Sequence, residues 1–375
     1  MTKLKNTGTS IFSIMSKMSH QYKAINLAQG FPDFNIAPRL IEIAKNSISK
    51  NIHQYTPMTG LPSLLDKIIN ITYRHYKRKV SASLNVLITA GATQGIYTTV
   101  NALVKQGDEV IILDPSYDNY EPSVLVAGGV PVRISLDDDY SPNFNKIEDA
   151  ITLKTKMIII NNPHNPTGKI WNESDFNFLE LLLDKYPNIL LLSDEVYEYI
   201  SFEHKHISVN TRPKLVDKAI IVSSFGKSLH ITGWKIGYLI AQENIMNEIK
   251  KVHQFLVFSI SSTSQYILSE YLDDVEFSDI AIMYEKKRLL FRENLKDSRF
   301  KLLPSEGTYF QLLGYREISS KKDTEFARDL IKKFGIATIP ISVFYKNKTD
   351  NKTLRLCFAK TDKTLTAAAD ILSSI

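Results

Sequence analysis

Six short apolar runs in the middle of the chain constrain its fold more than any other feature. They are rich in β-branched residues and show little alternation of apolar and polar positions: VLITA (86–90), EVIILD (109–114), PVRISL (131–136), KMIIINN (156–162), NILLLSDE (188–195) and KAIIVSS (218–224). Such strands are buried on both faces, as in a parallel sheet covered by helices. Helical patterns lie between them, over 93–105 and over 174–184, where Ser174 and Asp175 suit a helix start. The sequence therefore predicts an α/β fold.

The length and a change of pattern predict two domains. At about 150 residues per domain, a chain of 375 residues is expected to form two. From about residue 277 the pattern changes to charged helices, short strands around TYFQLL and TLRLCF, and a final alanine-rich helix. We expect a large domain over 41–276, a small domain over 277–375, and an amino-terminal arm over 1–40 that is part of the small domain.

Composition favours a small-molecule ligand over a macromolecular one. The excess of 46 basic over 40 acidic residues, a net charge of +6, is too dilute to require nucleic acid or an anionic membrane. The basic segment TYRHYKRK (72–79) is interpreted as a solvated helix face, and His204 and His206 lack a third metal ligand. With one cysteine, Cys357, no leader pattern and no run of 18 apolar residues, we expect a soluble cytoplasmic protein without a metal.

Two segments place polar groups where strands of the predicted sheet end. In LITAGATQGIYTTV a strand is followed by a small-residue turn at 91–93 and a helix, which suits a phosphate, although an ordinary strand-to-helix turn has the same pattern. In NNPHNPTGK (161–169), two prolines and a glycine make a rigid loop that can aim the amide of Asn165 inward.

Two further strand ends carry ionisable groups. In LLLSDEVYEYI, Asp194 ends an apolar strand, where it either meets a cation or caps a helix, and Tyr197 would lie one helical turn further on. In SSFGKSLHITGWKIGY, Lys227 follows a strand and a flexible Phe-Gly pair. A phosphate-binding P-loop is excluded because Ile221 stands where that motif needs a glycine.

A lysine that can form an imine, a carboxylate for a ring nitrogen, a phenol, an amide and a phosphate cup together suit pyridoxal 5′-phosphate. At these positions the chain resembles the class I and II aminotransferases, and it is most similar to the methionine aminotransferases and the kynurenine or glutamine transaminases. The supporting strings include INLAQGFPDF, HQYTPMTGLPSL, PHNPTG, SDEVYEYI, SSFGKSLHITGWKIGY, PSEGTYF and LRLCFAK. The resemblance implies the fold of type I pyridoxal phosphate transferases, with a mostly parallel seven-stranded sheet between helices and a smaller α+β domain.

The resemblance also implies roles for individual residues. Lys227 matches the lysine that holds the cofactor as an internal aldimine and later moves the substrate proton, and Asp194 matches the partner of the pyridinium nitrogen. Tyr197 and Asn165 match the groups that hydrogen-bond the 3′-oxygen. The other expected cofactor contacts are the phosphate cup of Ala92, Thr93, Ser224 and Lys235, the stacking ring of Tyr117, and Tyr55, which would reach the phosphate of the neighbouring subunit of a homodimer.

The resemblance assigns the substrate α-carboxylate to Arg355, with Asn165 and the backbone of Gly30 beside it. The alternative for Arg355 is a surface arginine on an edge strand. Phe12 and Phe258, the latter from the partner subunit, would line an apolar side-chain pocket, although core packing explains both almost as well. Such a pocket favours methionine, aromatic amino acids and glutamine over aspartate.

The sequence thus predicts a pyridoxal phosphate-dependent aminotransferase that moves the amino group of methionine, or of a similar apolar or aromatic amino acid, to a 2-oxo acid. Glutamine and kynurenine are further candidate donors. Two alternatives stay open at this point: a carbon–sulfur β-lyase acting on cysteine conjugates, and a non-catalytic regulator that binds the cofactor.

Overall fold

A seven-stranded sheet forms the centre of the larger part of the molecule in the computed structural model, which describes residues 3–4 and 8–375. Its strands are, in spatial order, β2 (Val86–Thr89), β8 (Gly237–Ala241), β7 (Ala219–Ser224), β6 (Leu190–Asp194), β5 (Thr155–Asn161), β3 (Glu109–Asp114) and β4 (Val130–Ser135). All neighbouring strands are parallel except at β8, which runs antiparallel to both β2 and β7. The predicted α/β fold with a mostly parallel sheet is confirmed.

Each of the six apolar runs forms a strand, and β8 is the one strand of this sheet that they did not include. Residues 237–241 are wholly buried, as are the edge strand β2 and nearly all of its other neighbour, β7. β8 comes at the end of the segment 223–241. Its five residues, GYLIA, are too few to show a helical or strand periodicity, so the sequence did not indicate a strand there.

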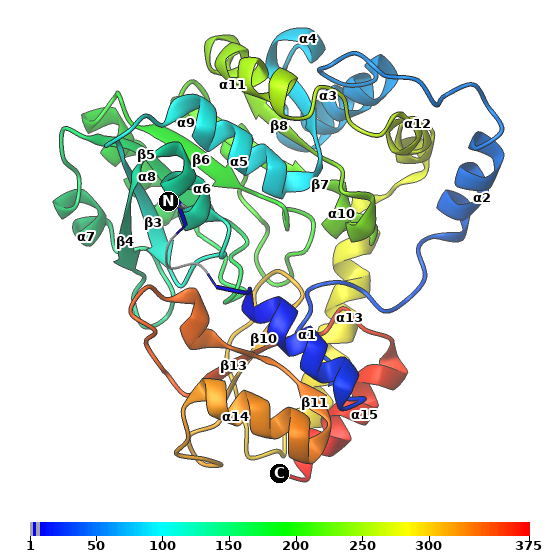
Figure 1. Ribbon diagram of the computed structural model, residues 1–375, viewed down its shortest axis with the longest axis vertical. Helices are drawn as coiled ribbons and strands as arrows, with labels where there is room; N and C mark the ends of the chain where they lie inside the picture. The colour runs from blue at the N-terminus through cyan, green and yellow to red at the C-terminus, as the bar shows by residue number, and fades with distance from the viewer. Residues whose placement is uncertain (1–2, 5–7) are drawn as a thin grey trace.

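Helices cover both faces of this sheet, as Figure 1 shows. Those between residues 62 and 271 are α3 (Pro62–Tyr76), α4 (Ala82–Asn85), α5 (Gly91–Leu103), α6 (Tyr120–Ala127), α7 (Phe144–Asp149), α8 (Glu173–Lys185), α9 (Pro213–Val216), α10 (Phe225–Ser228), α11 (Glu243–Leu256) and α12 (Ser262–Tyr271). The expected start of α8 at Ser174 and Asp175 is corrected by its cap. The Asn172 side chain accepts a hydrogen bond from the Asp175 amide, and the Asp175 carboxylate accepts one from the Asn172 amide.

A second, smaller body is built around an antiparallel sheet in the order β12 (Ile339–Pro340), β13 (Thr353–Cys357), β10 (Phe310–Gly314) and β9 (Lys301–Leu302). Beside it, β1 (Ile25–Asn26) pairs in parallel with β11 (Ile336–Ala337). Arg355 therefore lies on an interior strand, where it is 1% exposed, so its interpretation as a surface arginine on an edge strand is wrong.

The remaining helices are α1 (Ile11–Gln21), α2 (Pro38–Ser47), α13 (Phe277–Leu295), α14 (Asp323–Asp329) and α15 (Asp362–Ser373). Short segments are the 3₁₀ turns η1 (Val209–Thr211), η2 (Thr232–Trp234), η3 (Leu272–Asp274) and η5 (Ile341–Phe344), and the π turn η4 (Leu330–Phe334). α1 packs on the smaller body, against β1, β11 and β12 (Figure 1). The domain boundaries at 40 and 276 stay predictions, and residues 1–2 and 5–7 of the expected arm lie outside the described residues.

No helix formed by residues 3–4 and 8–375 is long and apolar enough to cross a membrane.

Candidate active site

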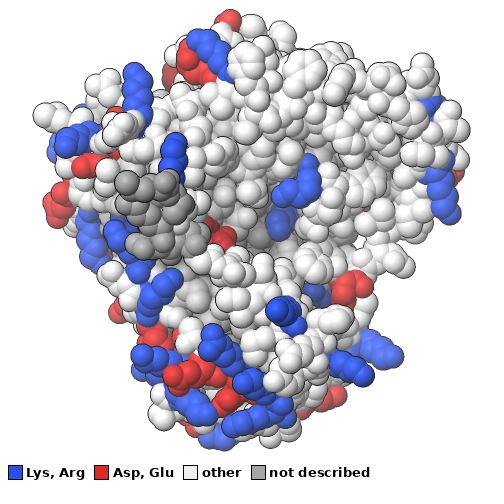
Figure 2. All heavy atoms as spheres, in the orientation of Figure 1, with Lys and Arg blue, Asp and Glu red and all other residues white. Residues whose placement is uncertain are grey.

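A cavity of about 290 Å³ lies where the parallel strands of the large sheet end. The surface view shows the molecule hollowed between its two bodies (Figure 2). The predicted site residues that line the cavity are Phe12, Gly30, Ala92, Thr93, Tyr117, Asn165, Asp194, Tyr197, Ser224, Lys227, Lys235 and Arg355. Segments far apart in the sequence therefore meet in one place, which is the site that open α/β sheets provide at the carboxyl ends of their strands.

Lys227 is held at the floor of this cavity by α10, the short helix that follows β7. The Phe-Gly pair before it, expected to be flexible, forms the first turn of that helix. The Lys227 amine donates a hydrogen bond of 3.3 Å to the carbonyl oxygen of Gly30, which also accepts one of 2.6 Å from the Tyr309 hydroxyl. Burial lowers the pKa of Lys227 to about 8, so a fraction of the amine is neutral near physiological pH.

Asp194 ends β6 and is buried. Its carboxylate accepts a 2.6 Å hydrogen bond from the Tyr120 hydroxyl and a 3.3 Å one from the Val196 amide. Burial raises the pKa of Asp194 to about 6, because few charges lie nearby to compensate its own. The residues after it form a turn, so the interpretation of Asp194 as a helix cap is wrong.

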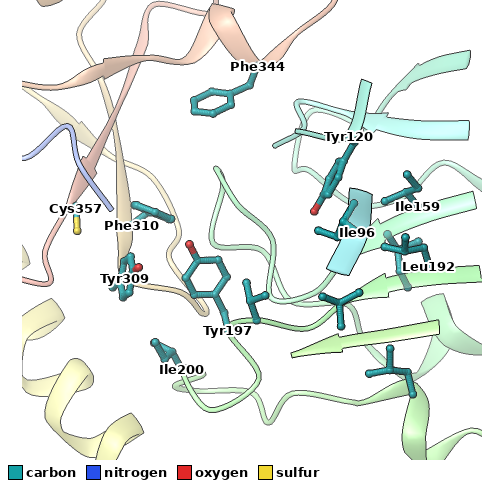
Figure 3. Packing of buried hydrophobic residues seen from close by; sticks show 14 of the residues in the cluster. Ile96, Tyr120, Ile159, Leu192, Tyr197, Ile200, Tyr309, Phe310, Phe344 and Cys357 are labelled. Carbon is teal, nitrogen blue, oxygen red and sulfur yellow. The ribbon is translucent and has the colours of Figure 1, made fainter. Parts of the chain in front are cut away.

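Tyr197 lies in that turn, and not one helical turn along as the sequence suggested. Its hydroxyl points into the space between β10 and the large sheet, with Phe310 and Phe344 on the opposite side (Figure 3). Burial raises the pKa of the Tyr197 phenol, so the group stays protonated at neutral pH.

Arg355 crosses the cavity from β13 toward Asn165. Its guanidinium donates to the Asn165 side-chain oxygen at 2.7 Å and to the Ala28 carbonyl at 3.2 Å. Its carbon Cζ lies 3.9 Å from the centre of the Phe310 ring and 5.2 Å from those of Phe12 and Phe344. Within the described part of the chain, this buried cation has no carboxylate in ion-pair distance, and its Nε has no hydrogen-bond partner. Such an uncompensated cation calls for an anionic ligand.

The first turn of α5 forms another anion-binding feature. No side chain of the described residues caps its first amides, and Gly91, Ala92 and Thr93 line the cavity. A Cβ atom built on Gly91 would lie 3.5 Å from the Lys235 amine, so this cation lies beside the helix start. Free amides, the helix dipole and an ammonium group at one point suit a phosphate.

Tyr55 and Phe258 do not line the cavity of their own chain. They are 84% and 45% exposed, and their rings pack edge to face at 5.6 Å. The core interpretation of Phe258 is therefore wrong, whereas Phe12 lies in the cavity wall and against the core.

Sequence reasoning missed several residues of this site. Tyr120 and Tyr309 hold Asp194 and Gly30, and Gln29 donates to the Phe12 carbonyl at 3.0 Å. Tyr309 and Gln29 belong to strings that carried the family resemblance, but no spacing rule connects any of the three residues to the group that it contacts. Among the described residues, no cluster of three His, Cys, Asp or Glu side chains is arranged to hold a metal ion.

Comparison with known proteins agrees with this geometry. The family model for aminotransferase class I and II matches residues 22–372. The chain is 40% identical to the methionine aminotransferase of Escherichia coli over 100% of its own length and 98% of that protein, and 30% identical to the kynurenine–oxoglutarate transaminase of Dictyostelium discoideum over 97% and 94%.

Solved structures give the same result. The crystal structure of YbdL from Escherichia coli, reported with a methionine aminotransferase function, superposes with a TM-score of 0.97 at 40% identity and covers 100% of this chain and 99% of that one. The N-succinyldiaminopimelate aminotransferase of Mycobacterium tuberculosis superposes with a TM-score of 0.95 at 30% identity, over 100% and 99%. This chain is an aminotransferase and belongs to the class I and II family.

Proposed function

We propose that this aminotransferase uses pyridoxal 5′-phosphate to move the amino group of methionine, or of a similar apolar or aromatic amino acid, to a 2-oxo acid. One observation carries the proposal: a buried lysine with a lowered pKa shares a cavity with a buried guanidinium that has no carboxylate partner. Both requirements, a nucleophilic amine and a carboxylate receptor, belong to amino-group transfer. The relatives named for methionine and kynurenine support the substrate class.

The donor set of the cavity fits the cofactor. The start of α5, Ser224 and Lys235 would hold the phosphate, and Asp194 would lie against the ring nitrogen. Tyr117 would stack on the ring, since its own ring lines the cavity and packs edge to face on Tyr120 at 5.6 Å. When bound, the cofactor supplies an aldehyde that condenses with amines and a protonated ring that accepts electrons.

Lys227 has two tasks in this proposal. Its neutral form would be the nucleophile for the cofactor aldehyde, and the same amine would be the base that takes up the proton leaving the substrate Cα. A pKa of about 8 leaves a usable fraction of base near neutral pH. The Gly30 carbonyl offers the released amine a hydrogen-bond acceptor at 3.3 Å.

Asp194, Tyr197 and Asn165 adjust the charge on the cofactor. Asp194 would become ionised beside a protonated ring nitrogen, since that positive charge lowers the pKa of the carboxyl from its present value of about 6. Asn165 uses its oxygen to accept from Arg355, so its amide nitrogen is the group that can donate to a bound oxygen. The Tyr197 hydroxyl would be the second donor to that oxygen.

Arg355 would bind the substrate α-carboxylate through its fork of donors. The cations among the cavity-lining residues are Lys227, Lys235 and Arg355. With Lys227 and Lys235 assigned to the aldehyde and the phosphate, none is left for a second carboxylate. Phe12 and Phe310 supply apolar wall instead, which supports methionine and aromatic donors over aspartate.

A group of exposed apolar residues supports a homodimer with shared sites. Tyr55, Phe255, Leu256 and Phe258 are between 45% and 86% exposed and form an apolar surface that a second copy of the chain would cover. Tyr55 would then reach the phosphate of the neighbouring subunit, and Phe258 its side-chain pocket. We place the enzyme in the cytoplasm, where its single buried cysteine stays reduced.

The test is a panel of about twenty amino acids against several 2-oxo acids, with Lys227→Ala as the control. We expect methionine to be among the best donors, aspartate to be poor, and borohydride to fix the cofactor to Lys227, as read by peptide mass spectrometry. Pyruvate and ammonia released from a cysteine conjugate without any acceptor would instead favour the carbon–sulfur lyase.

A further inference from the structure

We propose that Arg133 is a positioning residue for the substrate carboxylate: it fixes the backbone at Phe344, whose ring helps to hold Arg355 in place. The proposal rests on the proposed role of Arg355. Arg133 does not line the cavity, and it lies on the large sheet, whereas Arg355 lies in the smaller body. The carboxylates that bind Arg133 are not among the residues assigned to the cofactor or the substrate.

Arg133 lies on β4, opposite Ile112 of β3, and its side chain is 8% exposed. Its guanidinium donates to the Asp114 carboxylate at 2.6 Å and to the Glu121 carboxylate at 2.5 Å. The remaining nitrogen, Nη2, lies against the same Asp114 oxygen and also donates to the Phe344 carbonyl at 3.0 Å. The contacts use three different nitrogens of the planar arginine fork, whereas a lysine has a single nitrogen to offer.

The segment that begins at Phe344 is tied to the large sheet by two more hydrogen bonds. The Ser116 amide donates to the same Phe344 carbonyl at 3.0 Å, and the Lys346 amide donates to the second oxygen of Asp114 at 2.9 Å. Asp114 therefore links Arg133 to the loop after Phe344: one carboxylate oxygen accepts from Arg133 and the other accepts from the backbone amide of Lys346. This arrangement fixes a loop of the smaller body against the edge of the large sheet.

The Phe344 ring is the part of this loop that reaches the site. It lies 5.2 Å from Cζ of Arg355 and 6.0 Å from the Phe12 ring, and Figure 3 shows it beside the space that the Tyr197 hydroxyl enters. Arg355 has only two hydrogen bonds of its own, to Asn165 and Ala28, and its Nε is unpartnered within the described residues. The surrounding rings consequently determine much of the tilt of its guanidinium.

The loss of Arg133 should therefore misplace Arg355 without touching the cofactor contacts. Displacement of a binding group by about 1 Å can lower a rate by up to about 100-fold when orientation matters. The effect should be confined to ligands with an α-carboxylate. That restriction separates a positioning role from a general loss of stability.

The test compares Arg133→Met with Arg212→Met as a matched control. Arg212 forms an equally dense network, with Glu173, Glu180 and Asn177, at 13% side-chain exposure, and none of these residues lines the cavity. The substrates are methionine and its decarboxylated analogue methylthiopropylamine, each reacted with the holoenzyme in single turnover. Binding of methylthiobutanoate to the holoenzyme, measured by calorimetry, gives a readout that does not depend on turnover.

For Arg133→Met we expect kcat/KM for methionine to fall about 10-fold, mainly through KM, and the affinity for methylthiobutanoate to fall by a similar factor. The rate with the amine should be unchanged, and Arg212→Met should alter none of these values. An equal loss with methionine and with the amine would overturn the proposal, because it would indicate a structural role alone.

A double-mutant cycle with Phe344→Leu tests the path from Arg133 to Arg355. If Arg133 acts through Phe344, the two losses in kcat/KM should be far from additive. Additive losses would overturn the proposal. The variant Arg355→Met distinguishes failure of this proposal from failure of the proposed function. If Arg355→Met lowers the rates with methionine and with the amine by the same factor, Arg355 does not bind the carboxylate and the proposed function itself is wrong on this point.

Discussion

The amine of Lys227 titrates in a range that can be followed without any turnover. Burial is the main cause of its low pKa, and the positive charges of Arg355 and Lys235 lower it further. In cofactor-free protein we expect the rate of acylation of Lys227 by a small reagent to rise with pH and to reach half its maximum near pH 8. Peptide mass spectrometry over a pH series gives this rate.

Lys185 provides the internal reference. It is a surface residue, and its hydrogen bond to Glu148 raises its pKa above the usual lysine value. Its acylation should therefore still be rising where that of Lys227 has levelled. If the two lysines titrate together, the buried and desolvated state assigned to Lys227 is wrong.

Tyr120 is expected to act on the cofactor through Asp194. Its hydroxyl donates to the Asp194 carboxylate at 2.6 Å, and this hydrogen bond favours the ionised form of the acid. In Tyr120→Phe the pKa of Asp194 should rise, so that less negative charge faces the ring nitrogen. A hydrogen bond to a charged group contributes about 1.5–3 kcal/mol, so we expect the affinity of the apoprotein for pyridoxal phosphate to fall at least 10-fold.

Fluorescence titration of the apoprotein measures that affinity. Tyr73→Phe is the control, because Tyr73 lies on α3, is 49% exposed and does not line the cavity. An unchanged dissociation constant in Tyr120→Phe would show that the hydrogen bond has no part in binding the cofactor.

The difference between Asp194 and Tyr120 illustrates which residues a sequence can identify. Asp194 is a carboxylate at the end of an apolar strand, which is costly unless it has a task, so its type and position both drew attention. Tyr120 starts α6, and only the fold of that helix over the sheet brings its hydroxyl to Asp194, 74 residues away in the chain. Aromatic residues of this kind are common in cores and give no signal by themselves.

Among the elements, the strands were the most predictable. A run such as residues 156–162 is apolar on both sides because it is buried on both faces, and this property is written in the sequence. The position of β8 was not predictable in this way. Both of its partners, β2 and β7, come before it in the chain, and no local pattern indicates that β8 runs antiparallel between them. The cap of α8 was misplaced by two residues because Asn172, Ser174 and Asp175 are all good capping residues.

The end of α3 is joined to the turn after β6 by a buried acid. The Tyr76 hydroxyl donates to the Glu198 carboxylate in a short hydrogen bond, and Glu195, His206 and Ser223 lie nearby. Burial, together with the negative charge of Glu195, raises the pKa of Glu198 to about 7. The folded protein therefore holds a proton on Glu198 that the unfolded chain releases above its ordinary pKa of about 4.5.

This difference makes Glu198 a cause of pH-dependent stability. Between pH 4.5 and 7 the unfolded chain binds fewer protons at this site than the folded protein, so the free energy of unfolding falls as the pH rises and then levels. Glu198→Gln removes the titration. As the pH rises from 4.5 to 7, we expect the free energy of unfolding of the variant to increase by about 1–3 kcal/mol relative to that of wild type. The difference in Tm between variant and wild type should therefore grow with pH.

Glu270→Gln serves as the control, because Glu270 is exposed and its loss removes no buried charge. The difference in Tm between this control and wild type should be flat with pH. A flat profile for Glu198→Gln as well would contradict the raised pKa of Glu198.

At the scale of the molecule, the site exists only because two bodies meet. Arg355 of β13 binds Asn165 of the large body, and Lys227 of the large body binds Gly30 near the amino terminus. Residues at these positions could be matched to a family from their motifs. Their distances, and the rings of Phe310 and Phe344 around Arg355, depend on contacts between residues far apart in sequence, which no local pattern encodes.

The proposed homodimer makes one prediction that a single subunit could not satisfy alone. If Tyr55 completes the neighbouring site, a dimer of one Lys227→Ala subunit and one Tyr55→Ala subunit has one intact site, made of Lys227 from one chain and Tyr55 from the other. Random reassociation of equal amounts gives half hybrid dimers, so the mixture should regain about one quarter of wild-type activity.

The assay uses a cofactor concentration too low to saturate Tyr55→Ala, and each variant alone should be nearly inactive. Tyr73→Phe mixed with Lys227→Ala should not exceed the activity expected from dilution of intact sites, since Tyr73 does not line the cavity. A Tyr55→Ala mixture no more active than its parents would mean that each chain builds its site alone.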